Sequence, residues 1–301
     1  MKKKVFFKIF GVSLLMSLLI APLRGGYVTI GSLDGFHISS IVGFIIYFIM
    51  TFYCLAKVRD KLSTTLILVS LLVGLNAITL PIRIMNFQGT LGSALECLIH
   101  ISAVLWGYVF YKSKRHLRVL TLTISIIWCF WFSIAGYKMW IHKLSYGTFT
   151  GKIDAGTNFD IQFQTSSGDT LSLVDFKGKY LLLDCWYTYC GICYKKMPEL
   201  QKLYDKYAGN NEIKIYGMHS FMKGDRDRNR TPENCSTGTQ ILENEGYKYP
   251  CLAIDIENPV LKELGINFYP TVLLFDRDSK LIFRGGIENA GDFIDKKLNY
   301  K

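Results

Sequence analysis

Two cysteines separated by two residues lie in the stretch DCWYTYCGICYKKMP (184–198), the part of the sequence best suited to chemistry. Cys190 and Cys193 follow an apolar run and stand where a helix is expected to begin, from Cys193 to Tyr207. A cysteine thiolate is a nucleophile, and the unpaired N–H groups at a helix N-terminus favour the thiolate. We therefore expect Cys190 to attack a disulfide and Cys193, one turn further along, to resolve the mixed disulfide.

A C-x-x-C pair also fits half of a zinc site, a stable structural disulfide or a copper carrier. Tetrahedral zinc requires a second pair of ligands at similar spacing, and Cys235 and Cys251 are sixteen residues apart with no flanking histidine. Copper carriage stays open, with His219 as the nearest candidate histidine. Redox chemistry is the interpretation that the pattern favours, and we expect no metal and no other cofactor.

The chain from about residue 158 onward alternates short apolar runs with amphipathic stretches. FDIQFQ (159–164) and TLSLVDF (170–176) flank a turn-like SSGD and predict a hairpin. Further strands are expected at KGKYLLLDCW, EIKIYGMHS, YPCLAID, TVLLFD and KLIFRGG, and further helices near 236–245, 259–265 and 288–299. Strands that alternate with helices predict an α/β domain over 158–301.

This half of the chain resembles the TlpA/ResA-type branch of the thioredoxin-like family. Trp186 stands four residues before the first cysteine, Pro198 stands five after the second, and Tyr269-Pro270-Thr271 precedes a strand, as in that family. The lead-in GDTLSLVDFKGKYLLLD is similar to the added N-terminal hairpin of the branch. The resemblance implies a thiol–disulfide oxidoreductase of the protein-disulfide reductase type and suggests apocytochromes c as clients. Gly191-Ile192 between the cysteines fits neither a reducing nor an oxidising pattern, so a disulfide-forming oxidase or isomerase stays open.

The same resemblance implies roles for residues around the cysteines. Asp184, six residues before Cys190, matches a buried acid of thioredoxin that accepts the proton of the second cysteine. Burial raises the pKa of a carboxyl group, so such an acid can take up a proton near neutral pH; a solvated acid at a strand end is the alternative. Pro270 is implied to follow a cis peptide bond beside the sulfurs. The implied substrate-binding residues are Trp186, Gly191, Ile192, Tyr269 and Pro270.

Other cysteines invite pairing if the domain is exported. Cys235 and Cys251 are candidates for a second disulfide across the helix expected at 236–245, with free, partly buried thiols as the alternative. Cys97 and Cys129 lie in apolar segments at similar depth, so a redox relay between them is a hypothesis. Glu96 and His100, four residues apart, are placed to pair on one helix face.

The first half of the chain has the composition of a helical membrane domain. Residues 1–142 contain 14 Lys or Arg and three acids, so the net charge of +11 belongs to this half. The neutral second half argues against a nucleic-acid partner, since such binding requires a basic face on a folded domain. A bilayer-crossing helix needs about 20 residues, and five apolar stretches of that kind lie near 5–22, 38–56, 63–82, 91–111 and 119–137.

Basic residues predict the orientation of these segments. The N-terminus and the loops after the second and fourth segments hold 11 Lys or Arg, whereas the alternate loops hold four. Positively charged loops stay in the cytoplasm, so we expect a cytoplasmic N-terminus in the inner membrane. Residues 143–157 would then link the membrane domain to a periplasmic domain. The expected partners are the bilayer, exported disulfide-bearing client proteins and a membrane electron donor.

Overall fold

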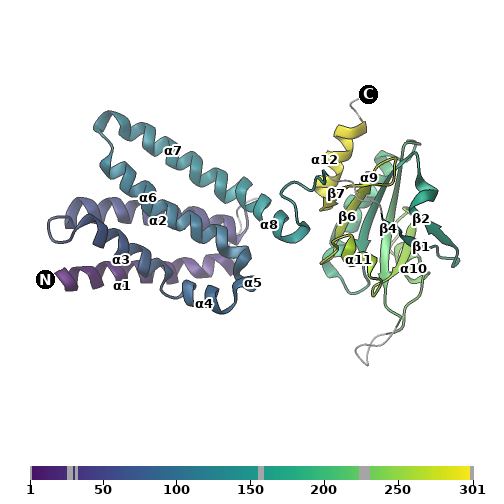
Figure 1. Cartoon of the computed structure of the whole chain (residues 1–301), viewed down its shortest axis with the longest axis horizontal. Helices are drawn as coiled ribbons and strands as arrows, with labels where there is room; N and C mark the ends of the chain where they lie inside the picture. Colours follow the sequence, from purple (N-terminus) through teal and green to yellow (C-terminus); the bar gives the residue numbers. More distant parts are fainter. Residues whose placement is uncertain (1, 26–29, 31–32, 155–158, 224–230, 299–301) are drawn as a thin grey trace. The chain divides into compact units, whose positions relative to one another are not determined.

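The computed structural model of the 301-residue chain describes residues 2–25, 30, 33–154, 159–223 and 231–298 (Figure 1). The chain divides into two compact units, Met1–Ile141 and His142–Lys301. Each unit has its own buried core. The expected architecture of a helical membrane domain followed by an α/β domain is confirmed.

The first unit is a helical bundle. Ser13 Oγ of α1 donates a hydrogen bond to Leu71 O of α3 at 2.7 Å, and Ser17 Oγ donates to Leu75 O at 3.2 Å, so two hydroxyl groups join these helices along their length. Its elements are α1 (Lys2–Ile20), η1 (Ala21–Gly25), α2 (Gly35–Val58), α3 (Thr64–Asn76), α4 (Thr79–Met85), α5 (Phe87–Thr90), η2 (Leu91–Ser93), α6 (Ala94–Lys112), η3 (Arg115–Leu117), α7 (Arg118–Trp131), the π-helical turn η4 (Phe132–Gly136) and α8 (Tyr137–Tyr146).

Four helices of the described residues are long and apolar enough to cross a membrane, or five if one bent pair counts as a single span. The bent pair is α3 with α4, which meet at 55°. Our expectation of one continuous helix at 63–82 was therefore wrong. Pro81 has no N–H to donate to Ala77 O, so the earlier helix cannot continue through this point, whereas proline is tolerated in the first turn of α4.

The second unit is built on a seven-stranded mixed sheet in the order β2-β1-β5-β4-β3-β6-β7. Strands β3, β4 and β5 are parallel, and β6 and β7 extend the sheet in antiparallel fashion. The elements are β1 (Gln162–Gln164), β2 (Thr170–Ser172), η5 (Leu173–Phe176), β3 (Tyr180–Trp186), α9 (Gly191–Lys206), β4 (Ile213–Phe221), α10 (Thr237–Asn244), β5 (Cys251–Asp255), α11 (Val260–Glu263), β6 (Thr271–Phe275), β7 (Leu281–Gly285) and α12 (Ile287–Leu298).

Both faces of the central strand β3 are covered, which explains why its sequence is apolar throughout. Leu181, Leu183 and Cys185 point into one core cluster. Leu182 and Trp186 point into the opposite cluster, together with residues of α9 and α12. Alternation along a strand places Asp184 on this second face, so one carboxyl group lies in an otherwise apolar layer.

Two local expectations differ from the structure. Residues 173–176 form a 3₁₀ turn rather than the end of a strand, because Ser172 and Asp175 make a capping box that begins a helical turn. Residues 143–154, which were expected to be part of a linker, belong to the second unit. Arg284 N–H donates to Gly151 O at 2.9 Å, and Ile153 N–H donates to Ile282 O at 3.0 Å.

Candidate active site

Cys190 and Cys193 lie at the start of α9 and are joined by a disulfide. Cys190 is the N-cap residue of the helix, and its Sγ accepts the Cys193 N–H at 3.2 Å. Cys190 is 6% exposed and Cys193 is 1% exposed, so Cys190 is the more accessible of the two cysteines. No acidic side chain stands in the first turn of α9, so the partial positive charge of the helix N-terminus acts on the sulfur without opposition from that turn.

The residues around the sulfurs form an apolar rim. Ile192 is 62% exposed and Tyr189 is 45% exposed, and Gly191 between the cysteines is also exposed. Trp186, which the sequence suggested as a substrate-binding residue, is instead buried at 1% exposure against the ring of His219. Trp186 therefore packs beneath the site, and the surface beside the sulfurs consists of the exposed residues Tyr189, Gly191 and Ile192.

Asp184 is buried, as its resemblance to the thioredoxin acid implied. The side chain is 3% exposed, and its Oδ1 has no hydrogen-bond partner among the described residues. Burial raises the pKa of Asp184 to about 7, with further contributions from the negative charges of Glu199 and Glu288. A carboxyl group that titrates near neutrality on the same sheet face as Cys193 is suited to accept a thiol proton.

The peptide bond between Tyr269 and Pro270 is cis, as predicted. Tyr269 Oη donates to Ser220 Oγ at 2.9 Å, and the Tyr269 ring lies 5.1 Å from the ring of Tyr187. The loop before β6 therefore contacts the end of β4 through a hydrogen bond and the segment that leads to Cys190 through an aromatic contact.

Two further features of the site were not foreseen from the sequence. Lys196 Nζ, one turn after Cys193, donates to Glu199 Oε1 at 2.9 Å and also to Glu288 of α12. Tyr146 Oη approaches Pro270 O at 3.5 Å. The helical spacing of Cys193, Lys196 and Glu199 was the available signal for the first feature, whereas no local pattern points to the second.

His219 is a structural partner of the loop before Cys190. Its Nε2 lies 3.0 Å from Thr188 Oγ1 and 3.9 Å from Glu233 Oε2, and the side chain is fully buried. Burial lowers the pKa of His219 to about 4, so the imidazole is neutral near pH 7. The described residues contain no group of three or more His, Cys, Asp or Glu that could hold a metal ion.

The second disulfide suggested for Cys235 and Cys251 is not present, and both thiols are free. The Cys251 thiol packs against α10, with Sγ 3.0 Å from the position that a Cβ on Gly238 would take. Cys235 lies in the preceding turn, where Asn234 Oδ1 accepts the Ser236 N–H at 2.9 Å. Burial raises the pKa of the Cys251 thiol to about 12.

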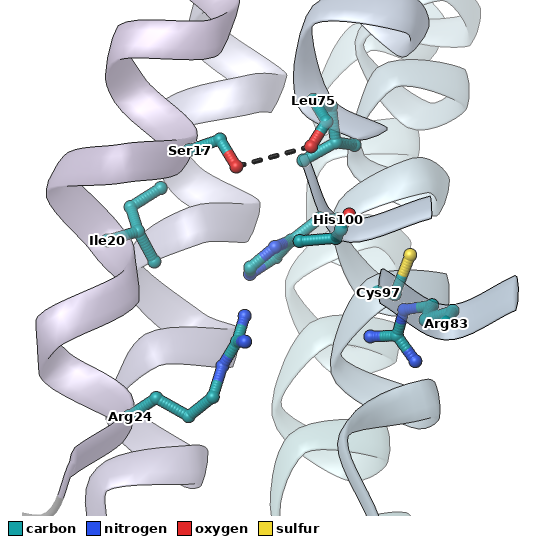
Figure 2. A pocket seen from close by; sticks show the side chains of 8 residues that line it. Ser17, Ile20, Arg24, Leu75, Arg83, Cys97 and His100 are labelled. Atoms are coloured by element: carbon teal, nitrogen blue, oxygen red, sulfur yellow. Dashed lines mark hydrogen bonds between the residues drawn. The ribbon is translucent and has the colours of Figure 1, made fainter. Parts of the chain in front are cut away.

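The helical unit has its own buried polar cluster, centred on Glu96. Glu96 does not pair with His100 as expected: it accepts Ser39 Oγ at 2.7 Å and forms an ion pair with Arg24 at 2.7 Å. His100 Nε2 lies 3.1 Å from Ser39 O. A neighbouring cavity of about 10 Å³, room for roughly one water molecule, is lined by Ser17, Ile20, Arg24, Leu75, Thr79, Arg83, Cys97 and His100 (Figure 2).

The cysteines of the helical unit are free thiols. Cys97 Sγ donates to Asn76 Oδ1 at 3.2 Å, and Figure 2 shows this thiol beside the guanidinium group of Arg83. Cys129 is buried in the core of the bundle. The relay between Cys97 and Cys129 stays a hypothesis.

The second unit is similar to a known protein family. Residues 154–293 match the family model described as Redoxin. Thiol-disulfide oxidoreductase ResA of Bacillus thuringiensis subsp. konkukian is 32% identical over 115 residues, which are 38% of this chain and 59% of that relative. Thioredoxin-like protein YneN of Bacillus subtilis is 32% identical over 94 residues, which are 31% of this chain and 55% of that relative.

Similar solved structures cover the same half of the chain. The thioredoxin domain of a thiol-disulfide oxidoreductase from Bacteroides vulgatus has a TM-score of 0.39 at 24% identity, covering 49% of this chain and 99% of that structure. The exposed lipoprotein thioredoxin of Streptococcus pneumoniae has a TM-score of 0.37 at 24% identity, covering 46% of this chain and 99% of that structure. The family match thus covers most of the second unit, which is built on the seven-stranded mixed sheet. The chain spans 59% of the length of the ResA relative.

Proposed function

We propose that this protein is a membrane-anchored thiol–disulfide oxidoreductase that reduces disulfides of exported proteins through Cys190 and Cys193. The observation that carries the proposal is the Cys190–Cys193 disulfide at the start of α9, on the same sheet face as a buried acid that titrates near neutrality. The relatives named thiol-disulfide oxidoreductase ResA support this type of reaction.

In the first step, the Cys190 thiolate of the reduced protein attacks one sulfur of a client disulfide. A bond forms between Cys190 Sγ and that sulfur, the client S–S bond breaks, and the other client sulfur leaves as a thiolate. The N-terminal N–H groups of α9 stabilise the attacking thiolate. The exposed side chains of Tyr189 and Ile192 provide an apolar contact for the client.

In the second step, Cys193 attacks Cys190 Sγ and gives its proton to the ionised Asp184. The Cys190–Cys193 disulfide forms, the bond to the client breaks, and the client leaves with both sulfurs reduced. Two electrons pass from the dithiol to the client. A dithiol donor at the membrane must then reduce the Cys190–Cys193 disulfide before the next cycle.

The anchoring and orientation of the protein rest on the helical half. Four or five helices are long and apolar enough to span a bilayer, and the excess of basic residues in alternate loops favours a cytoplasmic N-terminus. The Redoxin domain would then face the extracytoplasmic side, where exported proteins carry disulfides. Labelling of Cys235 in intact cells by a membrane-impermeant maleimide supports this orientation, and labelling only after lysis contradicts it.

Trapping of intermediates tests the reaction. A Cys193→Ser variant of the full-length chain cannot resolve, so we expect it to accumulate mixed disulfides with clients, and the Cys190→Ser variant serves as the matched control without an attacking thiol. Acid quenching of cells followed by a mass-shifting maleimide reports the resting state of the wild-type pair. A mainly reduced pair supports the reductase direction, whereas a mainly oxidised pair assigns the protein to disulfide formation. Mass spectrometry of the trapped partners tests whether apocytochromes c are among the clients.

A further inference from the structure

Asp184 is enclosed by a small set of ionisable side chains. In the sheet it pairs with Val272 of β6, which in turn pairs with Gly285 of β7, so a row of backbone positions leads from Asp184 to the start of α12. A Cβ placed on the next residue, Gly286, would lie 3.1 Å from Glu288 Oε2 and 3.5 Å from Tyr146 Oη. At this end of the row, Gly286 therefore lies next to the polar groups of Glu288 and Tyr146.

An ion cluster stands at this point and joins two helices. Lys196 of α9 donates to Glu199 of the same helix at 2.9 Å and to Glu288 of α12. The side chains of Lys196, Glu199 and Glu288 are 32%, 37% and 57% exposed, so all three members of the cluster are in partial contact with water. Lys196 follows Cys193 by three residues and lies on the same side of α9.

The cluster combines one positive and two negative charges. Both Glu199 and Glu288 disfavour ionisation of Asp184, and the hydrogen bond from Lys196 lowers the pKa of Glu288 despite its partial burial. The ionisable side chains that interact electrostatically with Asp184 from the packed elements are Glu199 of α9, Glu288 of α12, Tyr146 of α8 and Tyr249 before β5. Lys196 of α9 joins this set through its ion pairs with Glu199 and Glu288, whereas the neighbouring Cys185 points to the opposite face of the sheet.

We propose that Lys196 is a positioning residue for Asp184: held between Glu199 and Glu288, its ammonium group offsets their charges and controls how readily Asp184 exchanges its proton. This inference rests on the proposed function, in which Asp184 accepts the Cys193 proton. Without Lys196, two uncompensated carboxylates would face Asp184 and hold its proton more tightly. Without the charge of Glu288, Asp184 would release its proton more readily. The two substitutions therefore have opposite expected effects.

The test measures the alkylation rate of reduced Cys190 by iodoacetamide against pH, with full-length protein in detergent micelles and mass spectrometry of the Cys190 peptide. The inflection that disappears in Asp184→Asn reports the ionisation of Asp184. We expect Lys196→Met to move it upward by about half a pH unit and Glu288→Gln to move it downward by a similar amount, since partial exposure screens both charges. The variant that combines Lys196→Met and Glu288→Gln is expected to have a midpoint close to that of wild type. Lys196→Arg keeps the positive charge and is expected to keep the wild-type midpoint.

Lys195→Met, a change of the same charge at the exposed neighbouring position, is the matched control and should leave the midpoint in place. The proposal is overturned if Lys196→Met and Glu288→Gln move the inflection in the same direction or not at all, or if Asp184→Asn removes no inflection. Because no client takes part in alkylation, a shifted profile in a protein that reduces no disulfide substrate would keep this inference and reject the proposed function.

Discussion

Replacement of Asp184 by Asn is expected to change how the stability of the second unit depends on pH. The pKa of Asp184 rises from 3.8 to about 7 in the folded chain because of burial. One pKa unit corresponds to about 1.4 kcal/mol, so the difference of about 3 units corresponds to about 4 kcal/mol. A raised folded pKa stabilises the fold fully below about pH 4, and that stabilisation is lost as the pH rises through about 7.

Asparagine does not titrate, so the Asp184→Asn variant lacks this loss. Relative to wild type, we expect the variant to gain up to about 4 kcal/mol of unfolding free energy between pH 4 and pH 8. Urea-dependent hydrogen exchange of the β3 peptide, measured on the full-length chain in detergent, gives this quantity for the second unit alone. Asp205→Asn, at an exposed position of α9, is the matched control and is expected to change little with pH.

The same variant separates stability from chemistry. Loss of the proton acceptor is expected to slow resolution of the mixed disulfide by about 10- to 100-fold at pH 7, although the fold becomes more stable there. A stability difference between Asp184→Asn and wild type that stays constant from pH 4 to pH 8 would refute the reasoning, because it would mean that the pKa of Asp184 is the same in the folded and the unfolded chain.

Two further substitutions test packing in each unit. Gly238→Ala places a Cβ 2.5 Å from His219 Cβ, so we expect it to shift α10 and to cost about 1–3 kcal/mol of unfolding free energy. The control Gly209→Ala meets no atom within 4 Å and should leave thermal unfolding nearly unchanged. Equal losses of stability in the two variants would contradict the geometry. Glu96→Gln leaves Arg24 without its countercharge, and because Arg24 is 30% exposed we expect a moderate cost of about 2 kcal/mol, read as a lower melting temperature of the helical unit in detergent. An unchanged melting temperature would show that the Arg24–Glu96 pair contributes nothing.

The local features of this protein follow from its sequence. The strands and helices of the second half appear as alternation and amphipathic spacing, and the spans of the first half appear as apolar length, because these properties depend on neighbouring residues only. The spacing of Cys190 and Cys193 ahead of a helix likewise identifies the redox pair. The cis bond before Pro270 came from the family resemblance rather than from periodicity.

The tertiary structure decided which distant side chains meet. Lys196 and Glu288 are 92 residues apart and come together because α9 and α12 cover the same face of the sheet. Cys251 of β5 lies against Gly238 of α10, and it forms no disulfide with Cys235. Such pairings depend on strand register and on how helices pack, and no local pattern encodes them. The sequence by itself therefore determined the chemistry of the dithiol, and only the fold decided which charges surround the acid that serves it.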